Sequence, residues 1–264
     1  MQKTDSSLLS IEGLSARIGR QTILHDISLD IGRGECLAIV GGSGAGKSCL
    51  LKCLMGLAKP ATPFEGVLTF KGKKHNWSSR KPALVDRAAI SFVPQNPQAG
   101  LDPLKRLKSQ WEQTLRCSAA ESVSSRDISE LFSALKLKDL KSSYPHQWSQ
   151  GMQQRLLLAF ALVSSPDILI LDEPTSALDP LIASRCMLRI TELAARNNTA
   201  ILIVTHDLAL AARFADRTAI MNRGRIEEFG PTGRLLQDPQ SDYGKLLSAN
   251  RCWPTSCQED KQHA

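Results

Sequence analysis

The sequence lacks the features that mark membrane-spanning and secreted proteins. No apolar run reaches the ~20 residues that a membrane-spanning helix needs. The best candidate, residues 156–171, is interrupted by Ser164, Ser165, Pro166 and Asp167. The N-terminal residues contain no apolar segment of the length that a secretory signal requires. The chain itself is therefore expected to be cytosolic.

Aromatic residues and paired cysteines are also scarce. Aromatic side chains make up 5% of the sequence, which leaves little surface for stacking on the bases of a nucleic acid. The seven cysteines are odd in number and include no CxxC pair, so reduced thiols are favoured over a disulfide framework. Cys252 and Cys257 lie close together in the sequence, but two thiols are a weak metal signal. The net charge of +7 suits nucleic acid, an anionic membrane surface or a phosphorylated ligand, without choosing among them.

The sequence does contain an alternation of short apolar runs and helical segments. Its 264 residues, 42% hydrophobic and 22% charged, are typical of a globular protein with one or two domains. Apolar runs at residues 35–40, 168–171 and 200–204 predict buried strands, and residues 181–196 predict a helix between the last two. This order indicates right-handed parallel crossovers. Residues 105–140 show no strong strand pattern, so an inserted helical subdomain is expected there.

A glycine-rich segment between a predicted strand and a predicted helix matches the phosphate-binding pattern G-x-x-x-x-G-K-[ST]. Glycines allow successive backbone N–H groups to turn toward phosphates, and the helix N-terminus adds partial positive charge. We expect Lys47 to reach the β- and γ-phosphates of ATP and the Ser48 hydroxyl to bind Mg²⁺. The flanking elements argue against a merely structural turn. The expected ATP-binding residues are Gly41, Gly42, Ser43, Gly44, Ala45, Gly46, Lys47 and Ser48.

Two acidic residues follow the apolar run at residues 168–171. The strand would deliver Asp172 to the carboxyl edge of the sheet, where ligands bind in open α/β folds. Asp172 would then face the Mg²⁺ side of the phosphate loop, and Glu173 can polarise a water for attack on the γ-phosphorus. By itself the Asp-Glu pair is as consistent with a solvated strand end. The phosphate loop makes the catalytic interpretation the stronger one.

Four further segments make the pattern specific. They are Gln95 within FVPQNP, the segment WSQGMQQR at residues 148–155, SALD at residues 176–179, and His206 after an apolar strand. In this order the motifs resemble those of the ATP-binding subunit of an ABC transporter. The resemblance covers about residues 8–248. It implies a P-loop NTPase of the α/β class, with a mostly parallel core sheet, an N-terminal antiparallel β portion and an inserted helical subdomain.

The resemblance assigns roles to these residues. Gln95 corresponds to the Q-loop glutamine, which senses Mg²⁺ and water, and His206 corresponds to the switch histidine, which holds the γ-phosphate and the attacking water. With Glu173 they form the expected catalytic set, and Ser48, Gln95 and Asp172 form the expected Mg²⁺ set. Asp179 corresponds to the D-loop at a dimer interface. The signature segment, which contacts ATP held by the opposite subunit, corresponds to Ser149, Gln150, Gly151 and Met152.

The chain departs from the family pattern at two places. Gln150 replaces a signature glycine whose role is close backbone approach, which is expected to weaken the ATP site of the partner rather than the site on this chain. A chain with an intact phosphate loop and an altered signature suits a heterodimer with a second, non-identical ATPase. Ile18 stands where an aromatic residue commonly stacks on adenine, so base selection is expected to be looser.

The resemblance also implies a domain plan and partners. One ATPase domain is expected at residues 1–250, with the helical subdomain at about 103–165 and a polar tail at 251–264. Segments at residues 94–104 and 238–247 look like those of the peptide and nickel importer branch. The expected partners are two transmembrane permeases, a second ATPase and an extracytoplasmic solute-binding protein, with the chain peripheral on the cytoplasmic face of the membrane. The expected cargo is a metal or metal chelate, with small peptides close behind.

Two other classes of protein remain as alternatives. A non-transport ABC ATPase acting on nucleic acid or ribosomes would suit the basic charge. The sequence has no second nucleotide domain, zinc-ligand insertion or long coiled-coil arm, so no nucleic-acid partner is expected. A soluble P-loop kinase would give no reason for a signature segment between Gln95 and Asp172.

Overall fold

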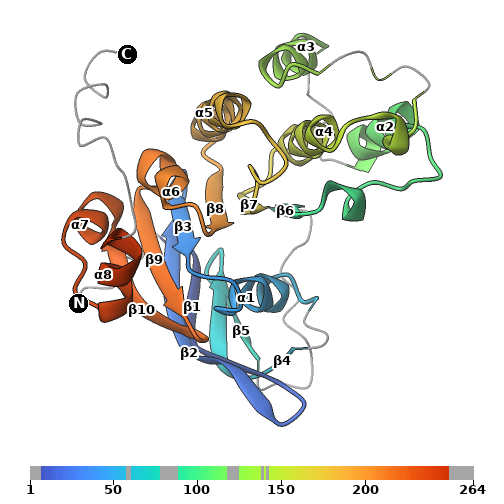
Figure 1. Ribbon diagram of the computed structural model, residues 1–264. Coiled ribbons are helices and arrows are strands. Elements are labelled where there is room, and N and C mark those ends of the chain that lie inside the picture. The colour runs from blue at the N-terminus through green and yellow to red at the C-terminus, as the bar shows by residue number, and fades with distance from the viewer. Residues whose placement is uncertain are drawn as a thin grey trace.

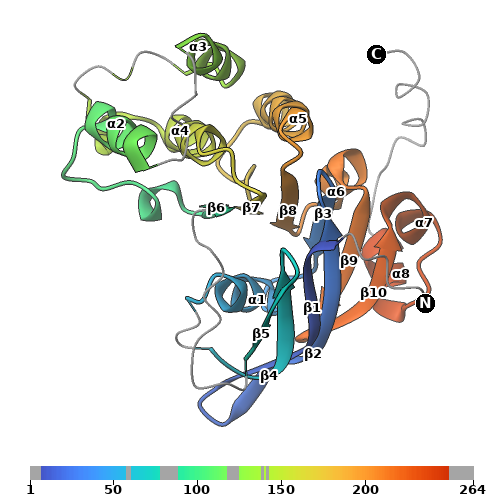
Figure 2. The ribbon, with the colours of Figure 1, turned by 180° about the vertical axis from the view of Figure 1, so that it is seen from behind.

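The structure is a computed structural model that describes residues 7–57, 61–77, 89–117, 125–137, 140 and 143–249. Two sheets and the helices around them make up this part of the chain, shown in Figure 1 and from behind in Figure 2. No helix among the described residues is both long and apolar enough to cross a bilayer. The tail expected at residues 251–264, with Cys252 and Cys257, lies outside the described residues.

The first sheet is antiparallel and has the strand order β2-β1-β4-β5. Its strands are β1 (Ser7–Ile18), β2 (Gln21–Gly32), β4 (Thr62–Phe70) and β5 (Lys73–Asn76). β1 and β2 form a long hairpin in which Ile18 pairs with Gln21. This sheet is the N-terminal antiparallel portion that the sequence analysis expected.

The second sheet has six strands in the order β10-β9-β3-β8-β7-β6. All of its neighbouring strands pair in parallel except β10, which is antiparallel to β9. The strands are β3 (Cys36–Val40), β6 (Ile90–Val93), β7 (Ile168–Asp172), β8 (Ala200–Thr205), β9 (Arg217–Asn222) and β10 (Arg225–Pro231). The mostly parallel core sheet is therefore confirmed.

The central strands of this sheet are continuous apolar runs because both of their faces are buried. Ile168 and Ile170 of β7 pack into a core shared with the antiparallel sheet, whereas Leu169 and Leu171 pack into a core formed with helices. Alternate side chains of a strand point to opposite faces, so a strand between two apolar layers needs apolar residues at every position. Helix α1 (Lys47–Leu54) lies in the first core, between the two sheets (Figure 1).

The opposite face of the parallel sheet is covered by α4 (Gln150–Val163) and α5 (Pro180–Arg196), with α6 (Leu208–Phe214) toward β3. Helices α2 (Leu107–Cys117) and α3 (Ser125–Ala134) pack on α4 and form the helical part of the insertion (Figure 1). Short helical turns η2 (Pro97–Ala99) and η3 (Pro145–Gln147) precede α2 and α4. Helices α7 (Thr232–Gln237) and α8 (Asp242–Ala249) follow β10.

Candidate functional site

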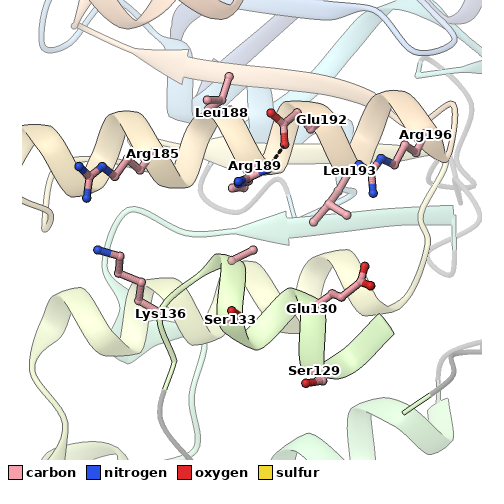
Figure 3. Close-up of a pocket in the computed structure, with 11 residues that line it drawn as sticks. Ser129, Glu130, Ser133, Lys136, Arg185, Leu188, Arg189, Glu192, Leu193 and Arg196 are labelled. Atoms are coloured by element: carbon pink, nitrogen blue, oxygen red, sulfur yellow. Dashed lines mark hydrogen bonds and ion pairs between the residues drawn. The ribbon is translucent and has the colours of Figure 1, made fainter. Parts of the chain in front are cut away.

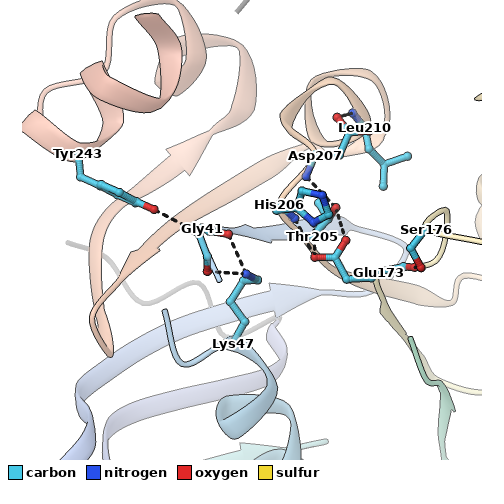
Figure 4. Close-up of polar contacts among 10 residues, drawn as sticks. Gly41, Lys47, Glu173, Ser176, Thr205, His206, Asp207, Leu210 and Tyr243 are labelled. Atoms are coloured by element: carbon cyan, nitrogen blue, oxygen red, sulfur yellow. Dashed lines mark hydrogen bonds and ion pairs between the residues drawn. The ribbon is translucent and has the colours of Figure 1, made fainter. Parts of the chain in front are cut away.

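The predicted phosphate loop connects β3 to α1 at the carboxyl edge of the parallel sheet. Gly46 has a φ of 104°, a conformation that favours glycine. A Cβ atom at Gly41 would lie 2.2 Å from the carbonyl oxygen of Met221, so the loop passes too close to β9 for a side chain. The Lys47 ammonium donates hydrogen bonds to the carbonyl oxygens of Gly41 and Gly42, at 2.7 and 3.0 Å (Figure 4). The loop and its lysine therefore form one compact unit.

Glu173 lies at the end of β7, opposite the phosphate loop. The residue is only 7% exposed, and its φ of 48° is uncommon for a residue other than glycine. Its carboxylate accepts hydrogen bonds from the Thr205 hydroxyl at 3.1 Å and from the His206 backbone N–H at 3.0 Å. The Nδ1 atom of His206 lies 2.8 Å from the same carboxylate (Figure 4). These contacts fix the carboxylate at the carboxyl ends of β7 and β8.

The charged groups of the site sit in an environment that disfavours their charged forms. Burial lowers the pKa of Lys47, and this effect exceeds the opposing influence of Glu173 and Asp172. Burial, reinforced by the negative charge of Glu173, raises the pKa of Asp172 above its usual value. A phosphate near Lys47 and a cation near Asp172 would each restore the balance of charge. The electrostatics thus match the polyphosphate and metal that the motifs predict.

These elements enclose a hollow of about 630 Å³ that brings most of the predicted site residues together. Gln95 reaches it from the connector after β6, and His206 from the end of β8. Ile18, the residue expected at the adenine, is not among the lining residues, whereas Ile23 of β2 is. The lining consists of Ile23, Gly42, Ser43, Gly44, Ala45, Gly46, Lys47, Ser48, Cys49, Gln95, Asp172, Glu173 and His206.

The signature segment lies outside this hollow, at the N-terminus of α4. Ser149 caps the helix, and its hydroxyl accepts a hydrogen bond from the Met152 backbone N–H at 3.3 Å. Ser149 and Gln150 are exposed. A Cβ atom at Gly151 would lie 3.1 Å from the carbonyl oxygen of Ala177, so a side chain at this position would be tightly packed against the loop before α5. The exposed helix N-terminus offers backbone N–H groups to an anion on another molecule.

Asp179 begins α5 close to the signature segment. Its carboxylate accepts hydrogen bonds from the backbone N–H groups of Leu181 and Ile182, at 3.0 and 3.4 Å. The side chain is therefore a helix cap within this chain. Leu181, beside it, is 60% exposed. This corner of the molecule presents apolar and polar groups to solvent together.

Another hollow, of about 710 Å³, lies between α3 and α5 (Figure 3). Its polar lining carries both signs of charge, and Arg189 forms an ion pair with Glu192 at 2.7 Å. None of the nucleotide-binding residues predicted from the sequence lines it. The hollow at the phosphate loop is therefore the candidate functional site.

Besides Ile23, three residues of this region were not anticipated from the sequence as parts of the site. The Thr205 hydroxyl accepts a hydrogen bond from the backbone N–H of Asp207 at 2.9 Å and donates one to the Glu173 carboxylate. Cys49 lines the hollow from the first turn of α1. Tyr243 of α8 touches the phosphate loop at Gly42. Thr205 stands directly before His206 in the sequence and could have been found by that position. Tyr243 lies in the segment at residues 238–247 that the sequence analysis singled out, but nothing in that segment indicates a contact with the phosphate loop.

Comparison with known proteins places the chain in a family. The family model described as ABC transporter matches residues 24–176. The chain belongs to the ABC transporter family. The dipeptide transport ATP-binding protein DppD of Lactococcus lactis subsp. cremoris is 38% identical over 83% of this chain. The nickel import ATP-binding protein NikD of Pseudomonas putida is 35% identical over 91% of this chain and 94% of its own length.

The fold of an ABC ATP-binding subunit is also seen in solved structures. A dimeric ATP-binding cassette in a post-hydrolysis state, bound to ADP and Pi, superimposes with a TM-score of 0.69. That protein shares 26% sequence identity, and the match covers 85% of this chain and 98% of the other. The chain spans 65% of the length of the Lactococcus relative.

Proposed function

We propose that the chain is the ATP-hydrolysing subunit of an ABC importer. The observation that carries this proposal is the convergence of Lys47, Ser48, Gln95, Asp172 and Glu173 on one hollow. In the proposed reaction the phosphate loop and Lys47 bind the β- and γ-phosphates. Glu173 acts as general base toward water, and hydrogen bonds from the Thr205 hydroxyl and from the backbone N–H that follows β8 hold its carboxylate in place.

The residues of the hollow suit Mg²⁺. The Ser48 hydroxyl, the Gln95 amide oxygen and the Asp172 carboxylate are oxygen ligands of the kind this ion prefers. Burial and the negative charge of Glu173 raise the pKa of Asp172, so a bound cation would favour the ionised form of this carboxylate. When bound, the ion would neutralise charge on the phosphates.

The signature end of the chain supports an ATPase dimer. Ser149 and Gln150 are exposed at the N-terminus of α4 and contribute nothing to this chain's own hollow. A second subunit would present its phosphate loop to this end. Because Gln150 places a long side chain where close approach is needed, we propose a heterodimer in which the partner's site is the impaired one. His206, whose side chain is 69% exposed, faces the site that the partner's signature completes.

The connector after η2 is proposed to contact a permease. The Gln110 side chain holds the connector in shape: it accepts from the Asp102 N–H and donates to the carbonyl oxygens of Asp102 and Lys105, each at 2.9 Å. This leaves Leu104 86% exposed directly after Pro103, whose ring restricts the backbone. Since Gln95, which precedes η2 in the segment between β6 and α2, lines the hollow, movement at the γ-phosphate can be transmitted to this surface.

The cargo is proposed to be a transition metal, a metal chelate or a small peptide. The relatives named DppD and NikD support both kinds of cargo and do not support the alternative of action on nucleic acid. Two permeases and an extracytoplasmic solute-binding protein complete the proposed importer. The chain would then be peripheral on the cytoplasmic face of the membrane, held there by the permeases.

The function is tested in proteoliposomes that contain the full chain, its permeases and the second ATPase. ATP-dependent uptake of nickel and of a labelled dipeptide is measured with the cognate binding protein on the outside. Lys47→Ala should abolish uptake of whichever cargo is carried. Uptake that continues undiminished in the Lys47→Ala complex would contradict the proposal.

The heterodimer is tested by mass measurement of the purified complex and by Gln150→Gly. The substitution should raise ATP hydrolysis at the partner's site alone, measured with the partner's general base intact and Glu173 changed to glutamine. A homodimer of this chain that supports full transport would contradict the assignment.

Cysteine crosslinking between residues 98–106 and the permease loops tests the proposed contact surface, and the absence of crosslinks with and without ATP would count against it.

A further inference from the structure

Helix α8, near the end of the described chain, touches the phosphate loop. The backbone N–H of Gly42 donates a hydrogen bond to the Tyr243 hydroxyl at 2.8 Å, across 201 residues of sequence (Figure 4). A Cβ atom at Gly42 would lie only 3.0 Å from the same hydroxyl oxygen. Because Gly42 is the second residue of the loop, this contact acts on the segment where the chain leaves β3.

The approach of Tyr243 is built by a network at the start of α8. The Glu228 carboxylate of β10 accepts hydrogen bonds from the backbone N–H groups of Gln240 and Ser241, at 3.0 and 2.7 Å, and from the Ser241 hydroxyl. The Ser241 hydroxyl oxygen in turn accepts from the Gly244 N–H at 2.9 Å. These hydrogen bonds hold the turn before Tyr243 against β10 and against the first residues of α8.

Gly244 shows how closely this turn is packed. A Cβ atom there would lie 2.5 Å from a carboxylate oxygen of Glu228 and 2.9 Å from the Ser241 hydroxyl oxygen. A larger residue at this position would have to displace the Glu228 carboxylate or the Ser241 hydroxyl. The ring of Tyr243 also packs on an apolar cluster that includes Val40 and Ile220, so its direction is fixed by packing as well as by hydrogen bonds.

The first residues of the loop are therefore held from two sides. Lys47 binds the carbonyl oxygens of Gly41 and Gly42, while Tyr243 binds the N–H of Gly42. In the proposed function Lys47 turns to the phosphates and releases those carbonyl oxygens. The tyrosine hydroxyl is then the side-chain contact that still fixes the start of the loop.

We propose that Tyr243 is a positioning residue for nucleotide binding, which holds the phosphate loop at Gly42 in the shape that receives the phosphates. It acts through the loop and does not touch the reacting atoms. With the hydroxyl removed, the Gly42 N–H loses its partner and the loop must be ordered by the nucleotide itself. The binding of ATP and ADP weakens, while the turnover of bound ATP stays the same.

The test compares Tyr243→Phe with the wild-type full chain. Phenylalanine keeps the ring in its apolar cluster and removes only the hydroxyl. The Kd of a fluorescent ATP analogue with Mg²⁺ should rise by roughly three- to tenfold, the scale of one lost neutral hydrogen bond. In the assembled importer KM for ATP should rise by a similar factor, with kcat unchanged. Tyr144→Phe is the matched control, because its ring stacks on His146 and the residue does not line the hollow at the phosphate loop.

A second variant tests whether Tyr243 positions the phosphate loop or only stabilises the folded chain. Ser241→Ala removes the hydroxyl that links Glu228 to Gly244 and should weaken nucleotide binding in the same direction, by a smaller factor. In the double variant Ser241→Ala/Tyr243→Phe the serine change should add nothing to Kd, because it acts through the tyrosine. An unchanged Kd in Tyr243→Phe would overturn the inference. So would a lower melting temperature in that variant without a change in Kd.

The inference rests on the proposed nucleotide site, and Lys47→Ala tells the two apart. If Lys47→Ala leaves nucleotide binding intact, the proposed site itself is wrong. If Lys47→Ala abolishes binding while Tyr243→Phe binds as tightly as wild type, the site stands and the role of Tyr243 is refuted.

Discussion

The two edges of the parallel sheet differ in whether folding favours or disfavours the charged forms of their side chains. At the amino edge, Asp167 accepts a hydrogen bond from Arg33 at 3.0 Å and forms an ion pair with Lys71. Burial would raise the pKa of Asp167, but these two partners together hold it below its usual value. Two hydrogen bonds to Asp30, at 2.9 and 3.0 Å, raise the pKa of Arg217 despite burial. The charges at this edge stabilise the fold.

At the carboxyl edge the balance is reversed. The pKa of Asp172 is raised by burial and by Glu173, and burial lowers the pKa of Lys47, so both charged forms are disfavoured in the folded chain. Glu173 adds a left-handed backbone conformation that costs about 1–3 kcal/mol in similar cases. The carboxyl edge, where the ligand is proposed to bind, therefore lowers the stability of the folded chain. The ion pairs of the amino edge offset part of that loss.

The largest expected effect comes from the general base at the carboxyl edge. Glu173→Gln keeps the shape of the side chain and its hydrogen bond from the His206 N–H, but it can no longer accept a proton from water. We expect kcat for ATP hydrolysis to fall by ~10²-fold or more, with ATP binding retained. Steady-state and single-turnover hydrolysis by the assembled importer measure the effect. Glu227→Gln, an exposed acid of β10, is the control, and near-wild-type single-turnover hydrolysis by Glu173→Gln would reject the assignment.

The next effect concerns the residue that holds this base. Thr205→Val keeps the volume of the side chain but removes the hydrogen bond to the Glu173 carboxylate. A hydrogen bond to a charged group contributes roughly 1.5–3 kcal/mol, so kcat should fall by about tenfold or more, with KM for ATP little changed. Thr205→Ser restores the hydroxyl and should recover most of the activity. Equal activity in the valine and serine variants would show that the hydroxyl does not position Glu173.

A smaller effect, on stability, is expected for the proposed metal ligand. Because the folded chain raises the pKa of Asp172, ionisation of this group opposes folding, and the cost grows as the pH rises above the ordinary value of 3.8. Without nucleotide and Mg²⁺, Asp172→Asn should therefore have a higher melting temperature than wild type at neutral pH. The difference should disappear near pH 3.8 and below. The same variant should gain less stability from ATP with Mg²⁺, and Asp238→Asn, at an exposed site, should show neither change.

The smallest effect is expected at the amino edge and has the opposite sign. Asp167→Asn removes both ion pairs and should lower the free energy of unfolding at neutral pH by about 1 kcal/mol. Because the pKa of Asp167 is lowered in the folded chain, its contribution is present above the ordinary value of 3.8 and is lost as the pH falls through the folded value. Urea unfolding at several pH values measures the trend. Nucleotide binding should not change, and a loss of ATP affinity in this variant would break the contrast between the two edges.

Much of the parallel sheet could be predicted because its chemistry is local. The run at residues 168–171 is apolar at every position, which only a strand buried on both faces requires, and the glycines at residues 41–46 signal a phosphate loop wherever they occur between a strand and a helix. Strands β5 and β9 and helix α6 were not predicted. β5 has no apolar alternation in its sequence, KKHN, and exists because it pairs with the edge of β4.

The sequence by itself determined the family, the phosphate loop and the acid pair after β7, because each is a short pattern whose residues act where they stand. Only the tertiary structure decided which distant groups complete the site. Thr205 and Tyr243 reach Glu173 and Gly42 because β8 pairs with β7 and because α8 folds back against β10. A hydrogen bond across 201 residues leaves no periodicity in the sequence, since it depends on where two elements meet rather than on the residues beside each partner.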